Sequence, residues 1–380
     1  MIVRHFLRWI QTASASERAE ATSALARAYL YSDLSVHDRL ATEAAMIVLL
    51  DDPSPLVRGA LADALASSQD APHTVILSLA SDQPGIAATI VSRSPLLSDA
   101  ELVDFVGGGA EWMQSAIAGR SPVSRAVAGA IAEVGCAAAC LVLIENPDAD
   151  ITVPALARIA ERHGELSAVR EALFARDDLP SEIRQSLVTR LSDTLARFVT
   201  ERAWLPEQRA REVTREARDR VTVALAAGCD ADEVASLVRH LVASGQLTGL
   251  LLLRALLSGN MCFLIEAFAE LSGMRAERVA AILSDRRGHG LRALYEKAGL
   301  PETAFGAFRA GIQAVHETGF SGDAPGASML KRRIVERVLT QYQGASGGEI
   351  DFLFAMLRKF AAEAARDEAR YYAADLVAAA

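Results

Sequence analysis

One short turn-and-helix segment constrains the fold of this chain more than any other feature. Residues 52–58 read DPSPLVR and continue into GALADAL, so a proline-containing turn leads into helix-forming residues, with Asp52 six positions before Arg58. A weaker copy, DLPSEIR, occupies residues 178–184 with the same spacing. A unit that occurs twice favours an array of helical hairpins over a single closed globule.

Composition and periodicity both point to helices. Apolar residues make up 51% of the 380-residue chain and aromatic residues only 6%, and much of the apolar fraction is Ala and Leu, which form helices that pack closely. In the first unit the pattern places Leu56, Leu61 and Leu65 on one helical face, together with two alanines. A leucine-rich stretch at 250–257 is too short to span a bilayer and predicts a buried helix. We therefore expect an all-α fold.

Two resemblances sharpen this expectation. The Asp and Arg of segments 52–58 and 178–184 resemble the HEAT-repeat consensus, which implies that the Asp of one repeat contacts an Arg of a neighbouring repeat. Because only these two segments keep both residues, we expect such contacts to be local. The chain also resembles an uncharacterised bacterial family, a domain of unknown function with HEAT-like helices, through 178–184, GLLLLRALL at 249–257 and AGLP at 298–301. That resemblance covers most of residues 20–320 and implies an irregular HEAT-like α-solenoid followed by a compact helical region.

The domain organisation follows from changes in composition along the chain. We expect HEAT-like helical repeats over residues 1–203, then a charged bridging helix and a helical domain over 204–318. A segment rich in Gly, Ser and Pro predicts a linker at 319–330. Residues 331–380 then predict a C-terminal helical pair with strong apolar faces, which would dock on a protein partner or on a second copy to form a homo-oligomer.

Charge and cysteine usage limit the classes of function. The net charge is −9 and the isoelectric point about 5.4, which opposes general attraction to nucleic acid. Four cysteines in a chain of this length do not form the pattern of a disulfide framework, so we expect a cytoplasmic protein. The N-terminal apolar stretch is interrupted by basic residues and does not match a signal peptide.

Candidate sites are few. Cys136 and Cys140 share a helix face, but three alanines lie between them and no second ligand pair follows, so we expect small buried residues rather than a metal site. No cofactor or catalytic residue is predicted. Trp112 and Trp204 are expected in the core, with an interface role as the alternative.

The sharpest polar cluster is a loop that contains Arg286, Arg287 and His289 between glycines. Two arginines can clamp a phosphate or carboxylate, and glycines allow the backbone to approach a ligand closely, so these three are the predicted ligand- or partner-binding residues. The alternative is an exposed connection whose basic residues offset a helix dipole.

We therefore expect a non-enzymatic scaffold or adaptor that binds a protein partner through a helical-repeat surface. A regulatory role is part of this expectation. One alternative is a nucleic-acid-binding HEAT-like protein or DNA base-excision enzyme, which would need a local basic face despite the acidic total. A further alternative is a sensor of a small anionic ligand that binds at the Arg286–His289 loop.

Overall fold

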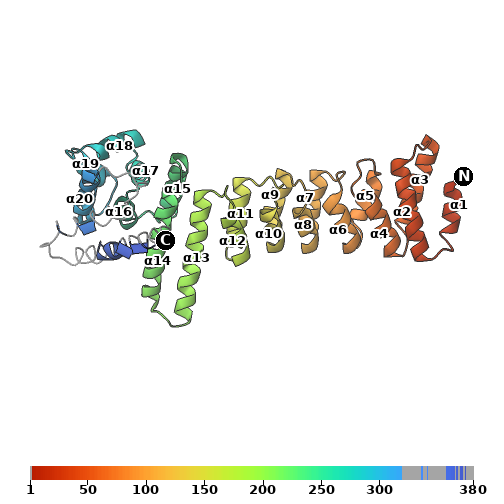
Figure 1. Cartoon of the computed structure of the whole chain (residues 1–380), viewed down its shortest axis with the longest axis horizontal. Helices are drawn as coiled ribbons and strands as arrows, with labels where there is room; N and C mark the ends of the chain where they lie inside the picture. The colour runs from red at the N-terminus through yellow and green to blue at the C-terminus, as the bar shows by residue number, and fades with distance from the viewer. Residues whose placement is uncertain are drawn as a thin grey trace. The chain divides into compact units, whose positions relative to one another are not determined.

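The computed structural model describes residues 2–318, 335–336, 340, 357–363, 365–366, 369–370 and 373 (Figure 1). Within these residues all regular elements are helices, and a single isolated parallel bridge joins Val123 to Ala149. The all-α prediction is confirmed. The chain divides into two compact units, Met1–Leu179 and Pro180–Ala380, whereas the sequence placed the first boundary at residue 203. The predicted linker at 319–330 lies outside the described residues.

Unit 1 is built from short helices joined by tight turns. They are α1 (Ile2–Trp9), α2 (Ala15–Tyr31), α3 (Val36–Leu49), α4 (Pro55–Leu65), α5 (His73–Ala80), α6 (Pro84–Arg93), α7 (Asp99–Gly108), α8 (Glu111–Ala118), α9 (Arg125–Val134), α10 (Ala137–Glu145), α11 (Val153–His163) and α12 (Ser167–Ala175).

Successive layers of unit 1 pack in two rows. The even-numbered helices from α2 to α12 each contact the next one. In a second row, α7 contacts α9 and α9 contacts α11. In α4 the buried positions are Val57, Leu61, Ala62 and Leu65, which recur with helical spacing. Leu56 is 64% exposed, so its predicted place on the apolar face was wrong.

Local sequence signals explain where these helices begin. Ser14 and Ser98 form capping boxes with the glutamate three residues later, which satisfies otherwise unpaired N–H groups of the first turn. Pro55 and Pro84 occupy the first position of α4 and α6, where a missing N–H costs nothing. Pro55, one of the residues that made the segment at 52–58 conspicuous, thus begins α4.

Unit 2 begins with the two longest helices and continues with shorter ones. They are α13 (Ser181–Glu201), α14 (Glu207–Ala227), α15 (Ala231–Ala243), α16 (Gly249–Leu257), α17 (Met261–Ser272), α18 (Ala276–Ser284), α19 (Leu291–Lys297) and α20 (Glu302–Thr318).

The core of unit 2 forms around α16, whose residues from Leu251 to Leu257 are all buried. The leucine-rich segment is therefore the buried helix that the sequence predicted. Phe268, Tyr295 and Phe308 pack beside it with ring centroids 5.3 to 6.4 Å apart. α13 packs on α14 as an antiparallel hairpin, which explains why the unit boundary falls before α13 rather than at residue 203.

The described C-terminal residues also belong to this core. Leu357 and Phe360 are buried, and the Glu363 carboxylate accepts a hydrogen bond from the Arg254 guanidinium at 2.8 Å. Arg254 also lies over the Phe360 ring, 4.3 Å from its centroid. Leu357 and Phe360 therefore pack on their own chain. Docking of the predicted C-terminal helical pair on a partner or a second copy stays a prediction.

Candidate functional site

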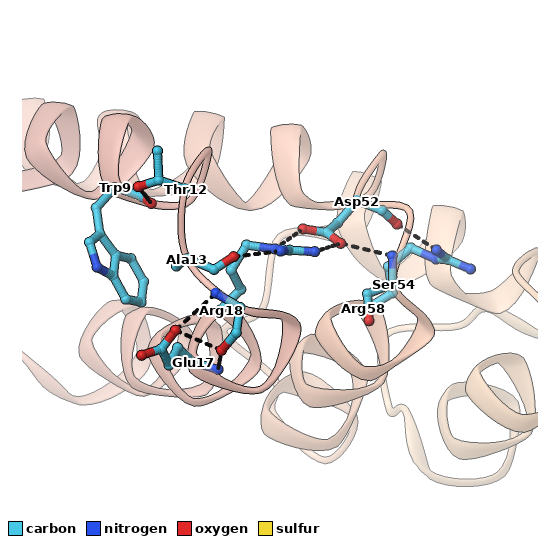
Figure 2. Close-up of polar contacts among 9 residues, drawn as sticks. Trp9, Thr12, Ala13, Glu17, Arg18, Asp52, Ser54 and Arg58 are labelled. Atoms are coloured by element: carbon cyan, nitrogen blue, oxygen red, sulfur yellow. Dashed lines mark hydrogen bonds and ion pairs between the residues drawn. The ribbon is translucent and has the colours of Figure 1, made fainter.

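Two arginine–aspartate pairs join successive layers at the start of unit 1. Arg18 on α2 donates two hydrogen bonds, of 2.8 and 2.9 Å, to the Asp52 carboxylate in the turn before α4 (Figure 2). Arg58 on α4 donates 2.6 and 3.0 Å bonds to Asp82 before α6, and a third to the Asp52 carbonyl. The contacts that the HEAT resemblance implied for Asp52 are thus present.

These pairs set the ionisation of their carboxylates. The hydrogen bond from Arg18 is the main cause that lowers the pKa of Asp52, and the bond from Arg58 does the same for the pKa of Asp82, while burial opposes both shifts. In the second predicted unit, Asp178 pairs with Arg176 in its own turn, at 2.7 Å. That the layer-to-layer contacts are local stays a prediction.

Further along unit 1, side chains cap the C-terminal ends of helices in the preceding layer. The Arg120 guanidinium donates to carbonyls of Val91 and Ser94 at the end of α6. Arg162 donates to the Ala132 and Gly135 carbonyls at the C-terminal end of α9, at 2.8 and 2.9 Å. Carbonyls at helix ends lack intrahelical donors, so a cation there supplies both a hydrogen bond and charge complementarity.

Helix α3 in unit 1 carries an exposed apolar face. Ser35 caps the start of α3 by accepting the Asp38 N–H, and the inner side of α3 buries Ala45, Met46 and Leu49. Its outer side carries Val36, Leu40 and Ile47, which are 79, 62 and 45% exposed and recur with helical spacing. We call these three residues the α3 face. Adjacent exposed apolar side chains on one helix are typical of interaction surfaces.

A second exposed cluster closes the turn between α13 and α14. The Trp204 N–H bonds to the Val199 carbonyl and the Ala203 N–H to the Thr200 carbonyl, the two bonds of a Schellman cap. Trp204 stacks edge-on against Phe198 with centroids 5.7 Å apart. The cap usually places glycine where Ala203 has φ +54°, a conformation that costs an L-residue energy.

This cluster differs from the sequence expectation for Trp204. Its side chain is 62% exposed and Phe198 is 42% exposed, so neither ring belongs to a closed core. The Arg202 guanidinium lies over both rings, 4.8 Å from the Phe198 centroid and 5.9 Å from that of Trp204. Exposed aromatic residues under a cation make a surface of mixed apolar and positive character.

The predicted anion site is an exposed loop between α18 and α19. The Asp285 carboxylate accepts the N–H groups of Arg287 and His289, both at 3.0 Å, and these bonds lower its pKa. Asp285 therefore occupies the backbone donors that a phosphate would otherwise use. The side chains of Arg286, Arg287 and His289 are exposed, and a role for them as an anion clamp stays a prediction.

Of the two cysteines that the sequence predicted to be buried, Cys140 is buried and Cys136 is half-buried. Cys136 caps α10 by accepting the Ala139 N–H, and Cys140 is fully buried, with its pKa raised by burial to about 11. Among the described residues, no group of three or more His, Cys, Asp or Glu side chains is placed to hold a metal ion. In the same residues, no helix is long and apolar enough to cross a membrane.

The fold and surfaces define an all-α protein made of a layered helical unit and a second helical unit that begins with a long hairpin. The chain belongs to the DUF2336 family, described as uncharacterised proteins conserved in bacteria, whose family match covers residues 86–346. The family predicted from the sequence is therefore confirmed, although the match begins and ends later than the expected range of 20–320. No curated protein and no solved structure matches the chain significantly.

Proposed function

We propose that this protein is a non-enzymatic scaffold that binds a protein partner through the α3 face of unit 1. The observation that carries the proposal is the exposure of Val36, Leu40 and Ile47 on one side of one helix. Burying them against a partner would remove apolar surface from water at about 25 cal/mol for each Å². A partner helix or strand would bring matching apolar side chains to this face.

The layers beneath α3 supply the rigidity that such a scaffold needs. α3 packs on α2 and α4, and α4 is tied to its neighbours through the Arg58 bonds to Asp82 and to the Asp52 carbonyl. A surface held in a fixed geometry loses less conformational entropy when it binds. The α3 face would therefore act as a preformed element of a HEAT-like helical-repeat surface.

Position-specific photo-crosslinking in the source cells tests the proposal. A crosslinking amino acid at Leu40 should give a discrete adduct with another protein, and Ile47→Gln should abolish it without changing the melting temperature. The matched control is the same label at Val153, which is 48% exposed on α11 but is not part of the α3 face. Equal adducts from both positions, or an adduct insensitive to Ile47→Gln, would refute a dedicated binding face.

A further inference from the structure

Residues 357–363 dock on unit 2 as a short helix. They are helical throughout, and Figure 1 shows them in blue beside α14. Leu357 and Phe360 are 1 and 8% exposed, and they share one cluster of buried side chains with Val223 on α14 and the leucines of α16. Because the two residues are three positions apart, they lie on one face of the helix. We call residues 357–363 the C-terminal helix.

Charged contacts tie one flank of the C-terminal helix to the same unit. The Glu363 carboxylate accepts hydrogen bonds from Arg254 on α16 at 2.8 Å and from Arg220 on α14 at 2.5 Å. The Lys359 ammonium donates to Glu216 on α14 at 2.5 Å. Lys359 and Glu363 are four positions apart, as are Glu216 and Arg220, so opposite charges follow one another in matching order along both helices. A helix with the reverse order of charges would be repelled.

Arg254 makes this docking surface selective for a carboxylate. It is the only charged residue of α16, and the residues around it from Leu251 to Leu257 are all buried. Arg254 itself is 8% exposed, and its guanidinium lies over the Phe360 ring, 4.3 Å from the centroid. A buried cation is costly unless a carboxylate pairs with it, so the surface requires an acidic residue where Glu363 lies. Arg254 therefore recognises both an aromatic ring and a carboxylate three residues later.

A second carboxylate lies near Arg254. Asp219 precedes Arg220 on α14, and it is close enough to Arg254 for the two charges to interact. Burial raises the pKa of Asp219, and the positive charge of Arg254 is among those that act against this shift. When Glu363 leaves, the Asp219 carboxylate would therefore remain as a counter-charge for Arg254. We call Glu216, Asp219, Arg220, Val223 and Arg254 the α14–α16 surface.

We propose that the α14–α16 surface binds a helix of a partner protein, and that the C-terminal helix is its intramolecular occupant. The partner helix would carry the pattern Leu-x-x-Phe-x-x-Glu of residues 357–363, with two apolar anchors followed by a carboxylate. The tethered C-terminal helix has a high effective concentration, so it raises the affinity that a partner needs and thereby controls access. A second copy offers the same helix and gains no contact over the tethered one, which favours a different protein. This surface lies in unit 2 and is independent of the α3 face.

Hydrogen exchange on the full-length wild-type protein tests whether the C-terminal helix leaves its site separately. Its amides should exchange at least tenfold faster than those of residues 251–257 in α16, because release of this helix does not require unfolding of the core. Equal protection of the two segments would show that the C-terminal helix is a permanent part of the core, and it would overturn the proposal.

A fluorescent peptide with the sequence of residues 355–366 measures binding to the surface. Full-length Phe360→Ala, in which the tethered occupant has lost an anchor, should bind this peptide at least tenfold more tightly than the wild type. Adding Arg254→Met to that variant should weaken peptide binding at least tenfold. The matched control is Arg358→Gln, which changes an exposed residue of the C-terminal helix and should behave like the wild type. Circular dichroism verifies folding, and Glu363→Gln replaces Phe360→Ala if the latter unfolds.

Selection from a displayed library identifies the kind of partner helix. Helical peptides of twelve residues, varied at the positions that correspond to Leu357, Phe360 and Glu363, are selected on full-length Phe360→Ala. Enriched peptides should have apolar residues at the first two positions and Glu or Asp at the third, because Arg254 requires a carboxylate there.

Three results would overturn the proposal: equal peptide binding by the wild type and Phe360→Ala, binding insensitive to Arg254→Met, or enrichment without an acidic third position. A wild-type dimer in sedimentation velocity that Phe360→Ala dissociates would overturn it as well, because a second copy would then be the occupant. Phe360→Ala should leave the Leu40 photo-adduct of the α3 face unchanged, so failure of either proposal is recognised separately.

Discussion

Removing one partner of the Arg58–Asp82 pair should destabilise unit 1 by about 2–3 kcal/mol. The pair is bidentate at 2.6 and 3.0 Å, and its side chains are only 16 and 13% exposed. Hydrogen bonds to charged groups contribute about 1.5–3 kcal/mol when they are shielded from water, whereas exposed ion pairs contribute about 0–1 kcal/mol. Asp82→Ala leaves the Arg58 guanidinium with the Asp52 carbonyl as its remaining partner in the turn.

A double-mutant cycle separates the pair from the rest of the packing. Arg58→Met, Asp82→Ala and the double variant should give a coupling energy of about 1.5–2 kcal/mol in urea unfolding. A Trp204→Phe background leaves only Trp9 and Trp112, both in unit 1, as fluorescent reporters. The matched control is Arg125–Asp150, the same residue types, with side chains 70 and 55% exposed, whose coupling should stay below about 1 kcal/mol.

The dependence on pH provides an independent check. The Arg58 hydrogen bond lowers the pKa of Asp82 in the folded protein below the unfolded value of about 3.9. The contribution of this carboxylate to stability is therefore complete above that value and is lost as the pH falls through the folded pKa. Asp82→Asn should flatten the loss of stability below about pH 4. Equal coupling energies for the shielded Arg58–Asp82 pair and the exposed Arg125–Asp150 pair would refute the reasoning. An unchanged loss of stability below about pH 4 in Asp82→Asn would refute it as well.

Three other positions give sharp outcomes. Ala203→Gly should raise the stability of unit 2 by about 1 kcal/mol in Trp204-monitored unfolding, because glycine adopts φ +54° without a Cβ clash. A loss of stability would show that the backbone at Ala203 is not strained. Gln185→Leu should cost about 1–3 kcal/mol, because it removes the bonds from Thr222 and to Gln246 inside the protein; a neutral result would mean that the site repacks. Cys140 should resist thiol reagents at pH 8 until urea unfolds the chain, because it is buried and its pKa is raised to about 11. A Cys140→Ala control identifies the labelled peptide. Labelling of Cys140 in the folded protein would show that the packing around α10 opens.

Local patterns in the sequence predicted elements well where the signal was carried by adjacent residues. The Pro-containing turn at 52–58 begins α4, and the leucine-rich segment forms the buried α16, because capping and burial there depend on neighbours in sequence. The face of α4 was misplaced by one step. Val57 rather than Leu56 points inward, and a shift of one residue rotates a helical position by about 100°.

Contacts between distant residues left no local signal. Arg18 lies 34 positions before Asp52, in a segment without the turn motif that marks Arg58, so only the folded layers bring the two together. The bond between Arg254 and Glu363 joins residues 109 positions apart, and it places part of the C-terminal segment in the core of unit 2. Trp204 was expected in the core, yet its side chain is 62% exposed in the turn after α13, where Ala203 rather than a glycine takes the left-handed position of the cap.

The capping of each layer by a later one has a consequence for synthesis. Arg120 reaches back 26 to 29 residues to the end of α6, and Arg162 reaches back 27 to 30 residues to the end of α9. While the chain emerges from the ribosome, each layer keeps uncapped carbonyls until about 30 more residues are available. Unit 1 would then consolidate from its N-terminus one layer at a time, with the newest layer always the least protected from proteolysis.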